Sequence, residues 1–286
     1  MDPRCRPLAL DGGAVRWIPF LRRDRVGVTA RTTTNAMVPG AVEGPRVSRW
    51  MVPTLGVEVI ERYPHPGQGF TQGLVVEGDL VWESTGLYGQ STLRCYRLGD
   101  AVLQWVGALG DELFGEGICR IGCSLWQLTW KEHLALRWCP RTRTLQQTVA
   151  LDRHGWGACR MGGVLVTTDG TDELVVRNAH ALCPVRTLRA TAAACGSDPI
   201  GRLNDLTYAR GRLWTNLFRT PFIAAVHPRT GQVTDVVDVT RLTCDHVRGP
   251  LTCLNGIAAL PEPGHFLLTG KQWPYMYRVR FTAEPG

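Results

Sequence analysis

Five segments of the 286-residue chain repeat one pattern of small, polar and hydrophobic positions. In each, a polar or aromatic residue is followed by a small or acidic one and then by an aliphatic or small one. After a short gap with glycine, a hydrophobic strand follows. The segments are TQGLVVEGDLVWES, GEGICRIGCSLWQLTW, GWGACRMGGVLVTTDG, LNDLTYARGRLWTNLF and LNGIAALPEPGHFLLTG. Their motifs start at Gln72, Glu116, Trp156, Asn204 and Asn255, at separations of 44, 40, 48 and 51 residues. This spacing is close to the ~40–50 residues of a four-stranded propeller blade.

Each repeat is followed by stretches in which apolar and polar residues alternate, such as STLRCYRLG and FIAAVHPRTGQVTDVVDV. Alternation of this kind, with PRTG-type turns, is typical of antiparallel hairpins. The last repeat has room for only about three strands, whereas TLGVEVIERYP at 54–64 is a spare strand before the first repeat. Pairing the two would close the ring and remove both exposed sheet edges. The pattern therefore predicts an all-β fold, a five-bladed β-propeller over 54–283 closed by an N-terminal strand that pairs with the last blade.

Composition agrees with this prediction. The 32 Gly, 18 Pro and 10 Trp favour many short strands joined by tight turns. An apolar content of 44% suffices for a core, and a charged content of 20% is too low for a disordered chain. No stretch approaches the ~20 continuous apolar residues that a membrane-spanning helix needs, so we expect no membrane partner.

The net charge of +7 is concentrated near the N-terminus, where residues 1–50 carry nine Arg against four acidic residues. We expect 1–53 to be a poorly ordered, Arg-rich leader and 284–286 a short tail; a basic arm that binds a partner is the alternative. Because this charge lies outside the predicted propeller, nucleic-acid binding is not expected. The apolar run AVRWIPFL is broken by Arg16 and lacks the h-region of a secretory signal, which favours a cytoplasmic over an exported location. Met37 and Met51 are alternative starts.

The ten cysteines show no metal-binding spacing. There is no CxxC pair, and Cys244, His246 and Cys253 lack a second ligand pair at zinc-finger spacing. We therefore expect neither a metal nor another cofactor, and interpret most thiols as small buried hydrophobic groups. One or two disulfides fit the sequence if the protein is exported.

The five motif positions are equivalent, since each begins the predicted innermost strand of a blade. Their side chains should converge on one mouth of the central channel, with the neighbouring glycines allowing crowded strands to approach closely. Glu116 is the only carboxylate of this ring. Channel amides also serve simply to hold water, but a lone carboxylate among aromatics and amides has an easily perturbed pKa, which favours a functional role.

Several longer strings then identify a likeness: YPH followed by GFTQGL, WESTGLYGQSTLR, LFGEGI, QLTWKEH, GWG, TTDGTDEL, LNDL, LTCLNGIA and LLTGKQWP. Over roughly 59–281 the chain resembles the plant and bacterial type of glutaminyl-peptide cyclotransferase. The resemblance implies a metal-independent enzyme without cofactors. It would convert N-terminal glutamine of peptides or proteins to pyroglutamate and release ammonia, and we expect it to act as a monomer.

The resemblance also implies roles for individual residues. Glu116 in FGEG is the acid and base, Lys271 in TGK is the cationic group, and Gln72 and Asn204 are amide partners. Aromatic walls come from Phe70, Phe114, Trp130 and Trp156. The family usually has LNE where this chain has LND, which leaves the role of that second acid open. Independently, Lys271 is one of only two lysines against 30 arginines, which suggests a place where a compact ammonium is needed.

Two alternative functions stay open at this point. A calcium-dependent lactonase-like propeller could use Glu116, Asn204 and Asn255 as oxygen ligands. The single carboxylate, the nearby lysine and the count of five repeats rather than six argue against it. A non-catalytic propeller that binds peptide ends at the same mouth is the second alternative.

Overall fold

The computed structural model describes residues 52–192, 198–246, 248–249 and 251–283. The predicted leader, except for its last two residues, and the predicted tail at 284–286 lie outside this part of the chain. Within it the secondary structure is almost entirely β-strand, with a single-turn helix α1 (Thr240–Thr243) and a 3₁₀ turn at Pro66–Gln68. No helix among the described residues has the length and apolarity to cross a membrane.

Three sheets contain four antiparallel strands each, in sequence order. The first sheet consists of β2 (Thr71–Glu77), β3 (Leu80–Thr85), β4 (Thr92–Arg97) and β5 (Trp105–Ala108). The second consists of β6 (Gly115–Ile121), β7 (Ser124–Thr129), β8 (Leu134–Cys139) and β9 (Thr144–Ala150). The third consists of β10 (Ala158–Met161), β11 (Val164–Thr168), β12 (Glu173–Asn178) and β13 (Pro184–Arg189). The meander order follows from the short turns between successive strands.

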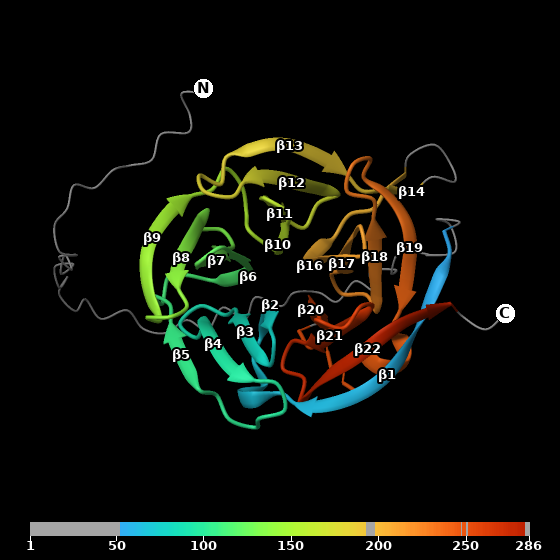
Figure 1. Cartoon of the computed structure of the whole chain (residues 1–286), viewed down its shortest axis with the longest axis horizontal. Helices are drawn as coiled ribbons and strands as arrows, with labels where there is room; N and C mark the ends of the chain where they lie inside the picture. Colours follow the sequence, from blue (N-terminus) through green and yellow to red (C-terminus); the bar gives the residue numbers. More distant parts are fainter. Residues whose placement is uncertain (1–51, 193–197, 247, 250, 284–286) are drawn as a thin grey trace, which may run out of the picture. The chain divides into compact units, whose positions relative to one another are not determined.

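The remaining strands form one ten-stranded sheet made of two groups. One group is β16 (Leu203–Ala209), β17 (Arg212–Leu217), β18 (Phe222–Val226) and β19 (Gln232–Asp238). The other is β20 (Leu254–Ala259), β21 (His265–Gly270), β22 (Tyr275–Ala283) and β1 (Thr54–Pro64). Two short strands, β14 (Thr191–Ala192) and β15 (Asp198–Pro199), pair beside β19. The all-β prediction is therefore confirmed, and the sheets are arranged as in a propeller (Figure 1).

The N-terminal strand pairs with the last group, as the sequence predicted. β1 runs antiparallel to β22, from Leu55 opposite Ala283 to Pro64 opposite Tyr275. At its start β1 also pairs in parallel with β19, where Thr54 lies opposite Val236. This strand thereby joins the two groups into one sheet and leaves neither edge unpaired at that point.

The first strand of each group lies nearest the common centre, and the fourth strand lies at the rim (Figure 1). The inner strands β2, β6, β10, β16 and β20 contact one another around this centre. Apolar side chains fill the space between adjacent sheets; Trp82 and Leu93 of the first sheet, for example, pack with Ile118 and Leu136 of the second. Burying a side chain of this size contributes about 1.5–3 kcal/mol, so packing between sheets fixes where the inner strands meet.

Two glycines show how closely the inner strands approach. A Cβ atom on Gly117 would lie 2.6 Å from Cα of Gly157, and one on Gly157 would lie 2.2 Å from the carbonyl oxygen of Asn204. Both distances are too short for any side chain, which confirms the predicted reason for glycine beside the ring. The equivalent place in the fourth repeat holds Asp205, so there a side chain enters the crowded centre.

Candidate active site

Four of the five motif residues occupy the same place in the fold. Gln72, Glu116, Asn204 and Asn255 are each the second residue of an inner strand. All four are buried, and only 5% of Glu116 is exposed. Trp156 lies two residues before β10, where its main chain bonds both to Thr168 and to Gly117 of the second sheet. The strand geometry therefore directs these side chains to one place, since alternate residues of a strand share a face.

A continuous set of hydrogen bonds connects the charged members of this ring. The side-chain nitrogen of Gln72 donates to Oε1 of Glu116 at 3.2 Å. Nζ of Lys271 donates to the side-chain oxygen of Gln72 at 2.6 Å, and the amide of Asn255 donates to the same oxygen at 3.1 Å. The amide of Gln72 thus stands between the carboxylate and the ammonium.

A second set of equivalent positions follows the second strand of each group. The residues directly after β3, β7, β11, β17 and β21 are Gly86, Trp130, Asp169, Phe218 and Lys271. Lys271 Nζ lies 4.5 Å from the ring centre of Phe70 and 5.4 Å from that of Phe218. Phe218 was not predicted as a site residue. Phe218 directly follows the second strand of its group, as Trp130 and Lys271 do in theirs. This shared position could have identified it from the sequence.

The four predicted aromatic residues belong to two clusters on either side of Lys271. Phe114 makes edge contacts with Phe70 at 6.4 Å and with Trp130 at 5.4 Å between ring centres. Trp156 makes an edge contact with Phe218 at 5.2 Å. Because the lysine amine contacts Phe70 in one cluster and Phe218 in the other, the two clusters flank the same charged group.

Burial dominates the ionisation of the two charged residues. It raises the pKa of Glu116 well above its ordinary value, although the charge of Lys271 acts in the opposite direction. Burial likewise lowers the pKa of Lys271, and here the charge of Glu116 opposes the change. Both shifts have the cause expected for charges removed from water. They bring the proton affinities of the two groups closer together, which suits proton exchange with a substrate.

A second carboxylate near Glu116 was missed from the sequence. Glu132, within the TWKEH string, accepts hydrogen bonds from the hydroxyl of Tyr88 at 2.7 Å and from the backbone nitrogen of Phe114 at 3.3 Å. Its charge adds to the rise in the pKa of Glu116. Burial and this carboxylate together raise the pKa of Tyr88 to about 12. No repeat-based signal pointed to either residue, because both lie in loops.

Asp205 is fully buried beside the ring. One of its carboxylate oxygens accepts the backbone nitrogen of Ile257 at 2.9 Å, and the other has no partner among the described residues. Burial raises the pKa of Asp205 well above its ordinary value, against the effect of the backbone amides that bond to it. A protonated acid is consistent with a buried oxygen that faces no donor.

Three polar atoms of the motif residues also lie buried without a partner in the described part of the chain. They are the side-chain oxygens of Asn204 and Asn255 and the indole nitrogen of Trp156. Buried polar atoms are normally hydrogen-bonded, so unpaired ones in a site are available to a ligand. Together they offer two acceptors and a donor near the ring.

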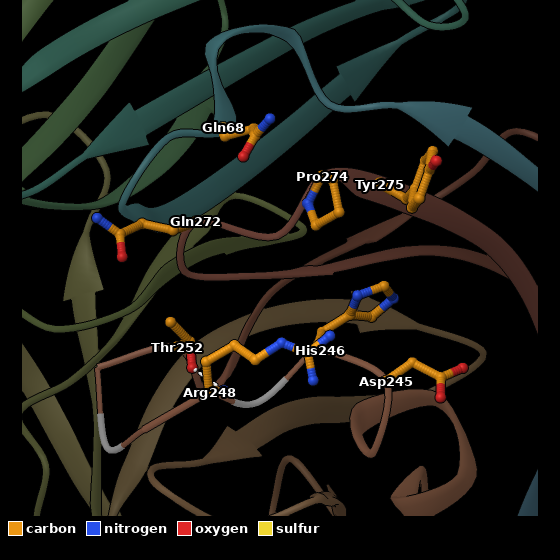
Figure 2. Close-up of a pocket in the computed structure, with 8 residues that line it drawn as sticks. All are labelled: Gln68, Asp245, His246, Arg248, Thr252, Gln272, Pro274 and Tyr275. Atoms are coloured by element: carbon orange, nitrogen blue, oxygen red, sulfur yellow. Dashed lines mark hydrogen bonds between the residues drawn. The ribbon is translucent and has the colours of Figure 1, made fainter.

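An open cavity of about 580 Å³ lies beside this region, between Gln68 and Tyr275 on one side and Arg248 and Thr252 on the other (Figure 2). Gln272, the neighbour of Lys271, also lines it. None of the predicted site residues belongs to its wall, so the cavity adjoins the site without containing it.

The structure thus brings Glu116, Gln72 and Lys271 into hydrogen-bond contact and places the aromatic residues around them. Asn204 lies on the neighbouring inner strand β16 but shares no hydrogen bond with these three. No cluster of three or more His, Cys, Asp or Glu side chains suited to a metal ion occurs among the described residues.

Comparison with known proteins identifies the family of the chain. The family model for glutamine cyclotransferase matches residues 32–281. A glutaminyl-peptide cyclotransferase of Arabidopsis thaliana is 28% identical over 234 residues, covering 78% of this chain and 71% of the plant protein. The crystal structure of Myxococcus xanthus glutaminyl cyclase superposes with a TM-score of 0.75 at 32% identity, covering 82% of this chain and 100% of that one. The chain therefore belongs to the glutamine cyclotransferase family.

Proposed function

We propose that this protein cyclises the N-terminal glutamine of peptides or proteins to pyroglutamate, and that the ring around Glu116 is its active site. The observation that carries the proposal is the buried link from Glu116 through the amide of Gln72 to Lys271. In this reaction the α-amine of the substrate attacks the carbon of its own side-chain amide. A carbon–nitrogen bond forms, a five-membered ring closes, and the amide nitrogen leaves as ammonia.

Positioning supplies much of the rate, because both reacting groups are on one residue. Well-oriented intramolecular attack reaches effective molarities of ~10⁵–10⁸ M. The remaining requirement is proton transfer. The α-amine has an ordinary pKa of ~7.7–8.0, so near neutral pH most substrate is an ammonium that cannot attack.

We assign the proton transfers to Glu116. Its carboxylate binds the substrate ammonium, takes one proton, and returns it to the departing nitrogen. A raised pKa fits this double role, since a general acid and base works best when its pKa is close to the working pH. Positioned acid–base catalysis of this kind contributes roughly 10²–10⁴-fold in rate.

We assign stabilisation of the tetrahedral intermediate to Lys271 with an amide group of Gln72 or Asn204. The intermediate carries a negative oxygen, and donors that are already fixed in a dry site stabilise it strongly. The Lys271 ammonium donates a hydrogen bond to the side-chain oxygen of Gln72. The aromatic residues Phe70, Phe114, Trp130 and Trp156 would exclude water and hold the aliphatic part of the glutamine.

We also infer that the five strand groups are five separate blades of one catalytic domain over 54–283, and that the enzyme is an acyltransferase acting as a monomer. The two groups in the ten-stranded sheet are joined only through β1, which supports counting them separately. The calcium-dependent hydrolase is not favoured, because the Lys271 ammonium beside the ring would repel a cation.

The test is incubation of the purified protein with a dipeptide that begins with glutamine, in the presence of a chelator. We expect release of one ammonia per dipeptide, followed both by mass and by an ammonia assay. The same dipeptide with an acetylated α-amine should release none, because it lacks the nucleophile. Binding without ammonia release would instead support the peptide-binding alternative, and loss of activity with chelator would support a metal-dependent enzyme.

A further inference from the structure

A buried pair of ionisable residues lies close to the ring but outside it. His65 comes just before the 3₁₀ turn that leads into β2, and Glu83 lies on β3. Nε2 of His65 is 3.0 Å from Oε1 of Glu83, and both side chains are 0% exposed. The catalytic roles assigned above do not involve either residue.

Both ring nitrogens of His65 face hydrogen-bond acceptors. Nδ1 lies 2.8 Å from the carbonyl oxygen of Trp273, and Nε2 faces the carboxylate of Glu83. The hydroxyl of Thr269, 3.4 Å from Nδ1, donates its own hydrogen to the carbonyl of Tyr275 at 2.9 Å. A neutral imidazole carries one hydrogen, whereas two acceptors require a hydrogen on each nitrogen. The contacts therefore indicate an imidazolium paired with a carboxylate.

Glu83 has a full set of donors that suit an ionised acid. Its Oε1 also accepts the hydroxyl of Thr71 at 2.7 Å, and its Oε2 accepts the hydroxyl of Tyr96 at 3.1 Å. Burial raises the pKa of Glu83, but the charges of His65 and Arg94 and the hydrogen bonds outweigh it and leave this pKa below its ordinary value. Arg94 and Tyr96, both on β4, are the other charged or titratable groups near the pair.

The pair is bonded to the segment that carries Lys271. The carbonyl oxygen of Trp273, two residues after Lys271, accepts from the His65 ring. The backbone nitrogen of His65 donates to the carbonyl of Pro274 at 2.9 Å, and the backbone nitrogen of Gln272 donates to Gly69 at 2.7 Å. Three hydrogen bonds thus tie residues 272–274 to the chain between His65 and Gly69.

The same pair is bonded to the strand that carries Gln72. Thr71, whose hydroxyl donates to Glu83, is the residue directly before Gln72. A Cβ atom on Gly69 would lie 2.6 Å from Oε1 of Glu83, so glycine is required where this segment passes over the carboxylate. The two segments that the pair holds are the ones whose side chains meet in the 2.6 Å contact between Lys271 and Gln72.

We propose that His65 and Glu83 are positioning residues for the cyclisation, an imidazolium–carboxylate pair that fixes Lys271 and Gln72 relative to each other. This inference rests on the proposed function. A buried ion pair adds little net stability compared with apolar packing, so its main effect here is geometric. Geometry matters at this site because a displacement of about 1 Å can cost ~10²-fold in rate.

The first test compares Glu83→Gln with Asp152→Asn. The control makes the same carboxylate-to-amide change in the loop between β9 and β10, where Asp152 bonds to the buried Arg177 of β12 at 2.6 Å. We expect Glu83→Gln to lower kcat about 10- to 100-fold while Asp152→Asn lowers it less than about twofold. Rates are normalised to folded protein, with thermal unfolding measured for both. Equal effects of the two variants on kcat would overturn the proposal.

Two milder variants keep the test valid if Glu83→Gln does not fold. Thr71→Val and Tyr96→Phe each remove one hydroxyl that donates to Glu83, but only Thr71 lies on the strand beside Gln72. We expect a several-fold lower kcat for Thr71→Val and a kcat close to wild type for Tyr96→Phe. The opposite order, or no difference, would contradict a positioning role.

The protonation of the pair has its own readout. In the NMR spectrum of wild-type protein with isotopically labelled histidine, His65 should show a hydrogen-bonded proton on both ring nitrogens, as its two contacts require. In Glu83→Gln it should lose one. A neutral His65 in the wild type would refute the imidazolium. This spectrum tests the ion pair independently of enzyme activity. The proposed function is refuted by a different result, namely a wild-type protein that releases no ammonia from a glutamine dipeptide.

Discussion

The ammonium of Lys271 donates a 2.6 Å hydrogen bond to the side-chain oxygen of Gln72. An ammonium can only donate hydrogen bonds. This contact therefore requires the oxygen of the Gln72 amide to face Lys271, and the nitrogen of that amide then faces Glu116. The 3.2 Å contact from that nitrogen to Oε1 of Glu116 agrees. The orientation of one neutral side chain thereby sets a donor toward the carboxylate and an acceptor toward the cation.

Replacing Lys271 with alanine should greatly reduce turnover. The change removes the cation assigned to the negative oxygen of the intermediate, and loss of one such donor typically costs about 10²–10³-fold in kcat. The matched control is Lys131→Ala, because Lys131 is the only other lysine and is exposed over the ring of Trp130. Ammonia release by the control should stay close to wild type. A Lys271→Ala protein with near-normal kcat would show that the role of this residue is misassigned.

Replacing Glu132 with glutamine should shift the acidic limb of the pH–rate profile to lower pH. The charge of Glu132 raises the pKa of Glu116, so its removal lets that pKa fall. The ionised form of Glu116 that accepts the substrate proton then persists to lower pH. The measurement is kcat/KM for a glutamine dipeptide across the acidic range.

The control for that shift is Tyr88→Phe, which removes the hydroxyl that donates to Glu132 and leaves both carboxylates in place. Its acidic limb should stay closer to that of wild type. If Glu132→Gln moved the limb upward or left it unchanged, Glu116 would not be the group that sets it.

Replacing Asp205 with asparagine should flatten the pH dependence of stability. The folded-state pKa of Asp205 is raised, so folding takes up a proton at any pH between its unfolded and folded values. In that window the free energy of unfolding of the wild type falls as pH rises. Asparagine has the same shape and stays neutral, so the variant should lose the contribution of Asp205 to the change of unfolding free energy with pH. Urea unfolding at a series of pH values from about 4 to 8 measures this pH dependence.

Glu116 also contributes to that slope, because its pKa is raised in the same direction. The slope of the Asp205→Asn protein should therefore decrease without vanishing. Asp79→Asn, a change of an exposed aspartate in the turn between β2 and β3 that pairs with Arg97, serves as the control and should change the slope less than Asp205→Asn does. An unchanged slope in Asp205→Asn would mean that the buried acid is ionised in the folded protein.

Much of the fold was accessible from the sequence because the repeats share one local pattern. The strand at 54–64 was predicted from its surplus position, and its pairing with β22 follows from the need to cover a sheet edge. The glycines beside the ring were predicted from crowding, and the short Cβ distances at Gly117 and Gly157 agree. The ten-stranded sheet was not predicted. It arises because β1 pairs with β19 as well as with β22, and this pairing depends on where two strand ends meet in space.

The candidate site was predictable where its residues hold equivalent places in the repeats. Gln72 and Glu116 were found in this way, whereas Phe218 shows an equivalence that was overlooked. Glu132 and Tyr88 could not be found by repetition, because they lie in loops that differ between repeats. Their effect on Glu116 depends on distances between loops, which no local pattern encodes.

The role of Glu116 is tested most directly by the ammonia-release rate of Glu116→Gln. Glutamine has nearly the same shape as a protonated glutamate, so the variant should fold with a similar thermal midpoint. Without an ionisable group it can neither take the proton from the substrate ammonium nor return it to the leaving nitrogen, and kcat should fall roughly 10²–10⁴-fold. A folded Glu116→Gln protein that releases ammonia from a glutamine dipeptide at the wild-type rate would contradict the account.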